Sequence, residues 1–351
     1  MFCLFYDSGS SVSEPVRAQK DIRCAHLLRR RAIPPLCSRW SPAPKKALLN
    51  SFRSGGELGL PINLPIVVAA LLTLAPLFAA AFFAASFAAG TQRLPLAARL
   101  ACLALPSVPY ALVARPGGSF RWIWFAVYAL LPVAVGALLW RAQLADKENR
   151  GDWRDFFVLG VLGVAVDLRW LEPAWPPHLA IFSKMLLLDV GIFAFVALRR
   201  LDGVGFDLRL RLRDAGFGLR EFAFYTPIAL ALGLWLGFLH LHGGWPGPLK
   251  ILFAWVFTFF FIAVPEELFF RGWLQNLLER RVGRLAALLI TSVLFGLSHF
   301  NKRAAHFNWQ YVLLAAFAGV FYGRAWRAER RVGASAITHA TVDAVWSLWL
   351  R

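Results

Sequence analysis

The sequence predicts an all-α protein, a polytopic transmembrane bundle of about 8–10 helical spans. Apolar residues make up 58% of the chain and charged residues only 17%, against about 45–50% and about 25% in ordinary globular domains. Apolar runs close to the roughly 20 residues that a bilayer requires recur from Leu60 to Leu350. Basic residues gather in the short segments between these runs, as they do in the loops of multi-pass membrane proteins.

Three regions differ in composition. Residues 1–59 are rich in Ser, Pro and Arg and lack helical periodicity, so we expect a disordered basic tail on the cytoplasmic side. Residues 60–198 are expected to form transmembrane helices, but they carry no motif that assigns them a role. Within them, Lys184 and Asp189 lie in one span and are expected to pair. Residues 199–351 place acids and histidines inside apolar runs, so we expect the catalytic transmembrane domain there.

The apolar runs predict nine membrane spans. Their ranges are 62–89, 95–114, 120–140, 178–198, 222–241, 249–278, 284–300, 309–326 and 332–350. The run Phe156 to Val166 is too short to cross and is predicted to be an interfacial or re-entrant piece. The positive-inside rule places the tail and the basic 199–220 segment on the cytoplasmic side, which requires four full spans between them. The basic segments Arg280 to Arg284 and Arg324 to Arg331 are then cytoplasmic too.

The formal net charge of +18 at first suggests nucleic acid as a partner. However, the basic residues are divided among short segments between apolar runs, which is typical of loops that face anionic lipid. We therefore expect an integral, multi-pass protein of the cell membrane, with membrane lipids as partners and no nucleic-acid binding.

Two acidic residues lie inside the apolar run 249–278. Acids are costly in lipid, so Glu266 and Glu267 require an explanation. On a helix, Glu267 and Arg271 are four residues apart with the acid N-terminal, which favours an ion pair that holds the helix. Glu266 points about 100° away from Glu267 and remains available for another partner.

Histidines in two other runs are predicted to reach the depth of Glu266. Counted from the cytoplasmic arginines at about 1.5 Å per residue, Glu266 and His299 both lie about 21–22 Å into the membrane. His339 and Asp343 share one face of the last run, about 12 and about 18 Å above Arg331. Ionisable groups inside a membrane are functional by default, so three runs that supply them at similar depth predict one site.

The chemistry of this site has three interpretations. A carboxylate beside an imidazole can deprotonate a water molecule that then attacks a peptide carbonyl, while further donors stabilise the oxyanion. Alternatively, Glu266, His299 and His339 suit a divalent metal such as zinc, although no HExxH motif is present and no cofactor is assigned with certainty. The same buried groups would also serve a proton-coupled transporter, although the sequence shows no internal repeat.

The polar residues resemble the ordered motifs of the CAAX protease and bacteriocin-processing family of intramembrane endopeptidases, which includes the type II CAAX prenyl proteases. The motifs are Glu266-Glu267-x-x-x-Arg271, Phe295-x-x-x-His299 and His339-x-x-x-Asp343, within about residues 200–351. The resemblance implies an all-helical membrane fold and hydrolysis of a membrane-anchored or hydrophobic peptide or protein substrate. It also implies that Glu267, Arg271 and Phe295 support the site.

The resemblance assigns roles to four residues as well. Glu266 and His299 match the pair that activates water, and His339 and Asp343 match positions on the oxyanion side. Asp343 stands where the prenyl-protein members of the family carry Asn. Because an ionised Asp would repel an oxyanion, Asp343 is expected to be protonated, to orient a neighbour through a hydrogen bond, or to bind a metal.

Overall fold

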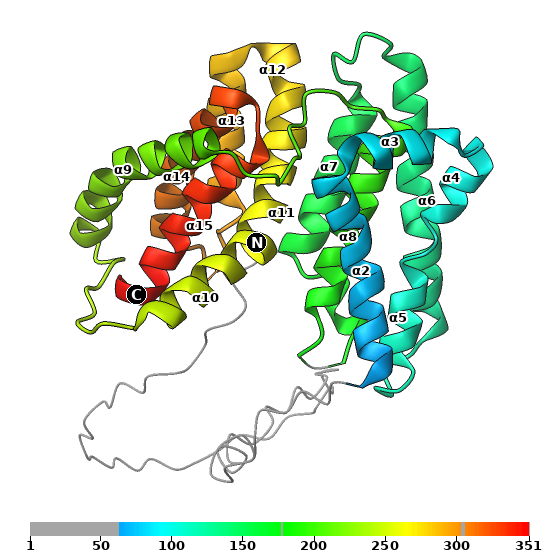
Figure 1. Cartoon of the computed structure of the whole chain (residues 1–351), viewed down its shortest axis with the longest axis horizontal. Coiled ribbons are helices and arrows are strands. Elements are labelled where there is room, and N and C mark those ends of the chain that lie inside the picture. The colour runs from blue at the N-terminus through cyan, green and yellow to red at the C-terminus, as the bar shows by residue number, and fades with distance from the viewer. Residues whose placement is uncertain (1–62, 177, 303–305, 351) are drawn as a thin grey trace, which may run out of the picture. The chain divides into compact units, whose positions relative to one another are not determined.

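The computed structural model describes residues 63–176, 178–302 and 306–350, and every regular element in these ranges is helical (Figure 1). The predicted all-α class is therefore confirmed. The predicted tail, residues 1–59, lies outside the described residues. The helices are α2 (Leu64–Phe82), α3 (Ala84–Arg93), α4 (Leu96–Cys102), α5 (Ser107–Ala114), α6 (Trp122–Ala145), α7 (Trp153–Asp167), η1 (Glu172–Ala174), α8 (Ile181–Phe193), η2 (Ala194–Leu198), α9 (Leu212–Trp235), α10 (Pro248–Thr258), η3 (Phe259–Ala263), α11 (Val264–Glu267), η4 (Leu268–Gln275), α12 (Asn276–Val282), α13 (Arg284–Leu297), α14 (Trp309–Glu329) and α15 (Val332–Trp349).

Five helical stretches among the described residues are long and apolar enough to cross a membrane. They are Leu64–Phe82, Leu96–Ala114, Trp122–Ala145, Ile181–Leu198 and Pro248–Val282. The other four predicted spans are helices too, but α13 is shorter and α9, α14 and α15 carry more polar residues. The chain is thus a polytopic helical bundle, and this indicates an integral membrane protein.

The basic segments that were predicted to share one side of the membrane contact one another. Arg280 Nη2 donates to the carbonyl of Asp202 (2.7 Å), and Arg330 Nη2 pairs with Glu279 Oε2 (2.6 Å). Arg331 Nη1 pairs with Asp207 Oδ2 (3.0 Å). Residues 199–214, 279–284 and 324–331 therefore lie at one end of the helices, which we call the basic end.

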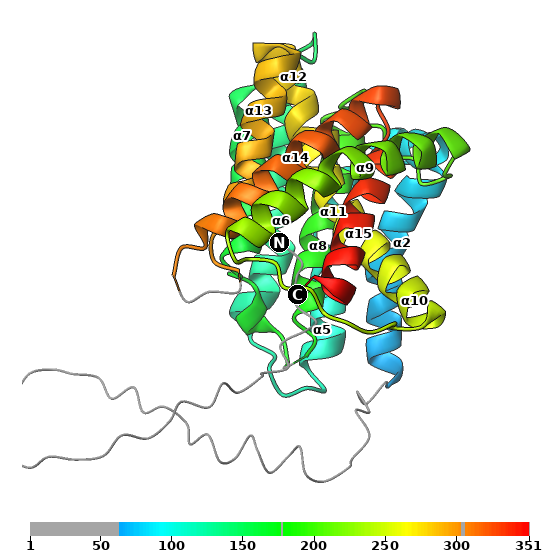
Figure 2. The same ribbon diagram turned by 90° about the vertical axis from the view of Figure 1, so that its left-hand side faces the viewer.

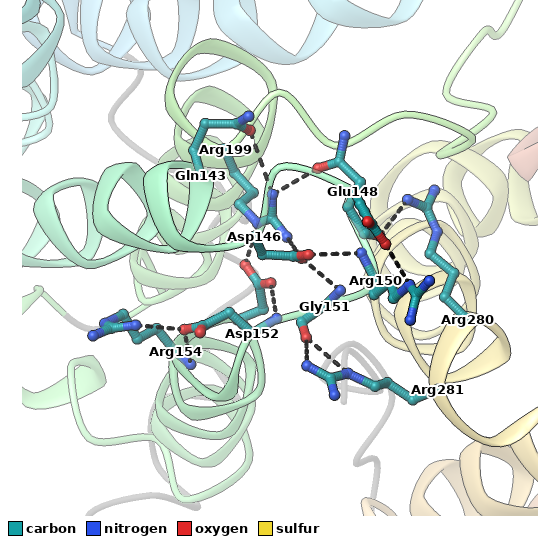
Figure 3. Close-up of polar contacts among 12 residues, drawn as sticks. Gln143, Asp146, Glu148, Arg150, Gly151, Asp152, Arg154, Arg199, Arg280 and Arg281 are labelled. Atoms are coloured by element: carbon teal, nitrogen blue, oxygen red, sulfur yellow. Dashed lines mark hydrogen bonds and ion pairs between the residues drawn. The ribbon is translucent and has the colours of Figure 1, made fainter.

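A buried arginine ties the loop between α6 and α7 to the basic end (Figure 3). Arg199, fully buried after η2, donates from Nε to Asp155 Oδ1 (2.7 Å) and from Nη2 to Asp146 Oδ2 (2.5 Å). Its Nη1 donates to Asn149 Oδ1 (2.6 Å). We call these four residues the Arg199 cluster. Arg280 Nη1 also donates to the carbonyl of Asn149 (2.7 Å), so the loop is bound to α12 as well.

The run Phe156 to Val166 is not among the five stretches long and apolar enough to cross a membrane, so its interfacial or re-entrant placement remains a prediction. This run belongs to α7, whose first turn supplies Asp155 to the Arg199 cluster at the basic end. At the other end of α7, the Asn301 side chain donates to the carbonyl of Asp167 (3.3 Å). Asp155 precedes the apolar run and lies in the first turn of α7, where it accepts from the backbone N–H of Asp152 and pairs with Arg199.

One consequence concerns the start of α2. The backbone N–H of Leu208, at the basic end, donates to the carbonyl of Ala81 (3.0 Å), so α2 ends there and begins at the opposite end. Five helical passes along the bundle, α2, α4–α5, α6, α7 and α8, thus separate Asn63 from the basic end, and four of them are long and apolar enough to cross a membrane, as predicted. The cytoplasmic placement of the tail remains a prediction.

The prediction that Lys184 pairs with Asp189 is wrong. Lys184 Nζ contacts Oε1 of Glu172 (3.0 Å), a residue that follows α7 in the chain. This ion pair links α8 to η1 rather than stabilising α8 internally. The described helices fall into one compact unit, and the predicted division into 60–198 and 199–351 remains a prediction.

The helix that carries the two adjacent glutamates departs from α-helical geometry on both sides of them. Helical turns run without a break through Pro248–Val282, but η3 and η4 are π-helical and flank the short α11. Single π-helical turns inside α-helices are rare and occur frequently at functional sites. Gly283, with φ of 82°, ends this stretch and lets α13 fold back beside it.

Helices α9, α13, α14 and α15 pack against one another, with α14 in contact with the other three (Figures 1 and 2). Glycine permits the close approach of α13 and α14, because a Cβ on Gly296 would lie 2.5 Å from the carbonyl oxygen of Val312. Helix α15 also contacts α10 and α11. The last helix therefore brings its polar residues to the glutamates of α11.

Candidate active site

His339, on α15, lies among three carboxylates. Its Nδ1 is 2.9 Å from Glu267 Oε1, and its Nε2 is 3.9 Å from Glu266 Oε2 and 3.5 Å from Asp343 Oδ2. His339 and both glutamates are buried, whereas 18% of the Asp343 side chain is exposed. We call these four residues the His339 cluster. The two glutamates approach opposite nitrogens of one ring, although they point in different directions from α11.

The predicted ion pair of Glu267 and Arg271 is present. Arg271 Nε donates to Glu267 Oε2 (3.0 Å), and both side chains are fully buried. Glu267 thus accepts from Arg271 with one oxygen and from the His339 Nδ1–H with the other. The arginine also lies over the Phe295 ring, with 5.4 Å between its Cζ and the ring centroid. These contacts fix the orientation of His339.

His299, just after α13, has a defined tautomer. Its Nδ1 is 2.9 Å from the carbonyl oxygen of Phe295. A carbonyl can only accept, so Nδ1 carries the hydrogen, and Nε2 of the neutral ring is an acceptor. An imidazole with a free acceptor nitrogen can take a proton from water or bind a metal ion.

Phe295 contacts both histidines. Its ring centroid is 5.0 Å from that of His299, and it meets the His339 ring edge to face at 5.6 Å. The Tyr322 ring, on α14, contacts Phe295 and stacks on His339, 4.6 Å from the His339 ring and 16° from parallel. The predicted supporting residue Phe295 is therefore placed as a spacer between His299 and His339.

A pocket adjoins the two histidines. It encloses about 680 Å³ of empty space, part of it open to the surroundings, and residues of α9, α13, α14 and α15 line it. His299, His339 and Asp343 border this pocket, whose remaining lining is mainly apolar or aromatic. The two glutamates do not border it, so His339 stands between the pocket and Glu266.

The structure brings together most of the residues that the sequence singled out. Glu266, His339 and Asp343 meet in the His339 cluster, and His299 shares the pocket with the last two. The assignment of Glu266 and His299 as a pair that activates water remains a prediction.

Sequence reasoning missed two features of this site. The contact between Glu267 and His339 was not foreseen, because it joins helices 72 residues apart in the chain. Tyr322 was not singled out either, although a signal was available. At about 1.5 Å per residue, Tyr322 lies about 12 Å above Arg330, the same depth as His339 above Arg331.

The metal interpretation named Glu266, His299 and His339 as ligands. Within the ranges that the structure describes, no group of three or more His, Cys, Asp or Glu side chains is arranged to hold a metal ion. The His299 acceptor nitrogen and the carboxylates have suitable chemistry for zinc, but they do not form such a group.

The site lies within a recognisable domain. Residues 248–345 match the type II CAAX prenyl endopeptidase Rce1-like family. This match confirms the resemblance on which the sequence motifs rest, and it spans all three of them, from Glu266 to Asp343. The Rce1-like domain covers less than a third of the chain, namely α10 to most of α15. No curated protein and no solved structure matched the chain.

Proposed function

We propose that this protein is an intramembrane endopeptidase that hydrolyses a peptide bond in a membrane-anchored or hydrophobic peptide or protein. The observation that carries the proposal is the convergence of Glu266, Glu267 and Asp343 on His339, beside a pocket that His299 also borders. All five residues belong to the Rce1-like domain. The family name supports a protease, and it alone suggests a CAAX-type prenylated substrate.

In the proposed mechanism, Glu266 is the general base toward a water molecule held with His299. The 3.9 Å between Glu266 Oε2 and His339 Nε2 exceeds a direct hydrogen bond and leaves the carboxylate oriented toward the ring that borders the pocket. The acceptor Nε2 of His299 suits a water that also contacts a carboxylate. The water oxygen attacks the peptide carbonyl, and its proton passes to the base.

The remaining residues hold and polarise the site. His339 donates from Nδ1 to Glu267, and Arg271 holds the other oxygen of that carboxylate. Among three carboxylates His339 acts as the imidazolium, so its Nε2 also carries a hydrogen, which faces Asp343 and the pocket and stabilises the tetrahedral intermediate. Asp343, four residues further along α15, orients the ring from the pocket side.

The mainly apolar pocket supports a hydrophobic substrate. An anchored peptide would arrive laterally through the membrane, with its apolar part in the pocket and its scissile carbonyl near His299 and His339. Pockets of this composition bind through apolar contact, while a few polar groups fix orientation.

The test is cleavage by the purified full chain in lipid. Wild type, Glu266→Gln and His299→Ala are incubated with a library of membrane-anchored peptides, some prenylated, and the products are identified by mass spectrometry. We expect cleavage by wild type and a loss of about 10²–10⁴-fold in each variant. Thr341→Ser, on the same helix as His339 but outside the cluster, is the matched control.

Two outcomes would change this proposal. Equal cleavage by wild type and both variants would refute the assigned residues, and loss on chelation that zinc restores would replace the metal-free mechanism with a metal-dependent one. The proton-coupled transporter predicts instead no cleavage by any variant, with proton flux into proteoliposomes that Glu266→Gln abolishes.

A further inference from the structure

We propose that Tyr322 is a further catalytic residue of this site, whose hydroxyl donates a hydrogen bond to the oxyanion of the tetrahedral intermediate. This inference rests on the proposed endopeptidase function. It names a residue outside the three sequence motifs, on a helix to which those motifs assign no role.

Tyr322 is placed for this role by its ring. The residue is buried on α14 and borders the same pocket as His299, His339 and Asp343. Its ring stacks on His339 with 4.6 Å between centroids and 16° between planes. Phe295, 5.6 Å away and nearly perpendicular, supports the ring from another side. The stacking leaves the phenol few alternative orientations.

The hydroxyl group is available to a substrate. Tyr225, which also borders the pocket, donates its hydroxyl to the carbonyl of Leu314 (3.0 Å) and is thereby used in packing α9 against α14. Tyr322 makes no such bond with any residue that the structure describes. A buried tyrosine hydroxyl normally finds a partner, and the partner available here is a group bound in the pocket.

The charges of the His339 cluster explain why a neutral donor is needed. An ionised carboxylate only accepts hydrogen bonds, so Asp343 cannot serve an oxyanion in the way that an Asn at this position would. Glu266, Glu267 and Asp343 also surround the one imidazole that could donate, which makes further negative charge unfavourable. The phenol of Tyr322 donates without adding charge, and it approaches from α14, which carries none of these acids.

The step balances without any further reactant. The water oxygen forms a bond to the carbonyl carbon while Glu266 takes its proton, and the carbonyl π electrons move to the oxygen. The Tyr322 O–H donates a hydrogen bond to this oxyanion and keeps its proton throughout. When the C–N bond breaks, the oxyanion electrons restore the carbonyl, and the proton held by Glu266 passes to the amine that leaves.

The experiment is a kinetic comparison of wild type and Tyr322→Phe in the full chain, purified in lipid, with one peptide that wild type cleaves. Phenylalanine keeps the ring stacked on His339 and removes only the hydroxyl. We expect kcat to fall about 10²–10³-fold, the effect of losing one oxyanion donor, while KM changes by less than about threefold.

Tyr110→Phe is the matched control. Tyr110 is fully buried and its hydroxyl accepts from the backbone N–H of Arg121 (2.9 Å), far from the pocket in the chain and on α5. The Tyr110→Phe variant should cleave as wild type does. This comparison separates the loss of the Tyr322 hydroxyl from the general cost of removing a buried tyrosine hydroxyl. Thermal unfolding of both variants is measured alongside.

Each outcome decides the inference. A Tyr322→Phe protein that is as stable as wild type and cleaves within about threefold of it would overturn the role of Tyr322 and leave the endopeptidase standing. A rise in KM with unchanged kcat would also overturn it, because the hydroxyl would then bind substrate and transition state alike. If wild type itself cleaves no peptide, the proposed function fails and the inference falls with it.

Discussion

The Arg199 cluster and the His339 cluster are both buried groups of charged residues, but they are assembled in opposite ways. Around Arg199, one cation meets two carboxylates and an amide, and each of its three guanidinium nitrogens donates at 2.5–2.7 Å to a different residue. Around His339, three carboxylates approach one imidazole, two of them at 3.5–3.9 Å.

This difference distinguishes charged residues buried for stability from charged residues buried for catalysis. Short hydrogen bonds from each guanidinium nitrogen of Arg199 compensate the desolvation of the cluster and hold the α6–α7 loop to the basic end. The longer contacts at His339 Nε2 leave room for a reacting group, and that side of the ring borders the pocket. We therefore expect changes in the first cluster to affect stability and changes in the second to affect catalysis.

The largest effect on stability is expected for Arg199→Ala. The substitution leaves the fully buried Asp155 without a counter-charge, and breaking such a pair costs about 3–5 kcal/mol. The thermal unfolding temperature of the purified protein in lipid would fall accordingly, while the cleavage rate per folded molecule would be retained. A variant that unfolds as wild type does would show that the cluster does not hold the loop.

Glu267→Gln should have an intermediate effect on both stability and catalysis. The amide retains an acceptor oxygen, but it removes the charge that compensates the buried Arg271 and orients His339. We expect a loss of about 1–3 kcal/mol in the free energy of unfolding, together with slower cleavage. Denaturation and kcat are measured on the same preparation, and a change in kcat alone would place Glu267 with the reacting groups instead.

Asp343→Asn should have a smaller effect. The Asp343 side chain is 18% exposed, borders the pocket and lies 3.5 Å from His339 Nε2, so its exchange for an amide of equal size alters the orientation of one ring. We expect kcat/KM to change by less than about tenfold, or about 1.4 kcal/mol, with unchanged stability. A hundredfold loss would instead identify Asp343 as an essential ligand or proton carrier.

The smallest effect concerns Asp207 at the basic end. Burial raises the pKa of this carboxyl, but hydrogen bonds from Arg209 and Arg331 outweigh it and lower the pKa to about 2. Because the folded pKa is depressed, the stabilisation is present above the ordinary value and is lost as the pH falls toward about 2. In Asp207→Asn the free energy of unfolding should therefore depend less on pH between about 4 and about 2 than in wild type, by on the order of 1 kcal/mol. Parallel curves for variant and wild type would contradict this.

Local geometry determines which features were predictable from the sequence. The pair of Glu267 and Arg271 follows from helical spacing, and it persists although η4 is π-helical. The all-helical class follows from the apolar runs. The course of α7 from the basic end to the opposite end was not predicted, because its apolar run is short and ends at Asp167. The arginine that pairs with Asp155 lies 44 residues further along the chain.

The same limit applies to the candidate site. Depth counting from the basic segments placed Glu266 and His299 at one depth, with Asp343 and His339 closer to the basic end. Spacing along a helix does not tell which carboxylate meets which nitrogen across helices. Packing of α15 on α11 decided that Glu267 rather than Glu266 binds His339 Nδ1. The lysine partner was misassigned for a similar reason, because Glu172 lies on a neighbouring segment.

The central claim is that Glu266 and His299 act on the same water molecule, and the most direct test is the double variant Glu266→Gln/His299→Ala. Residues that act as one unit are strongly non-additive in kcat. The account predicts that each single variant loses about 10²–10⁴-fold and that the double variant cleaves no more slowly than the worse of the two. Losses that multiply in the double variant would contradict it.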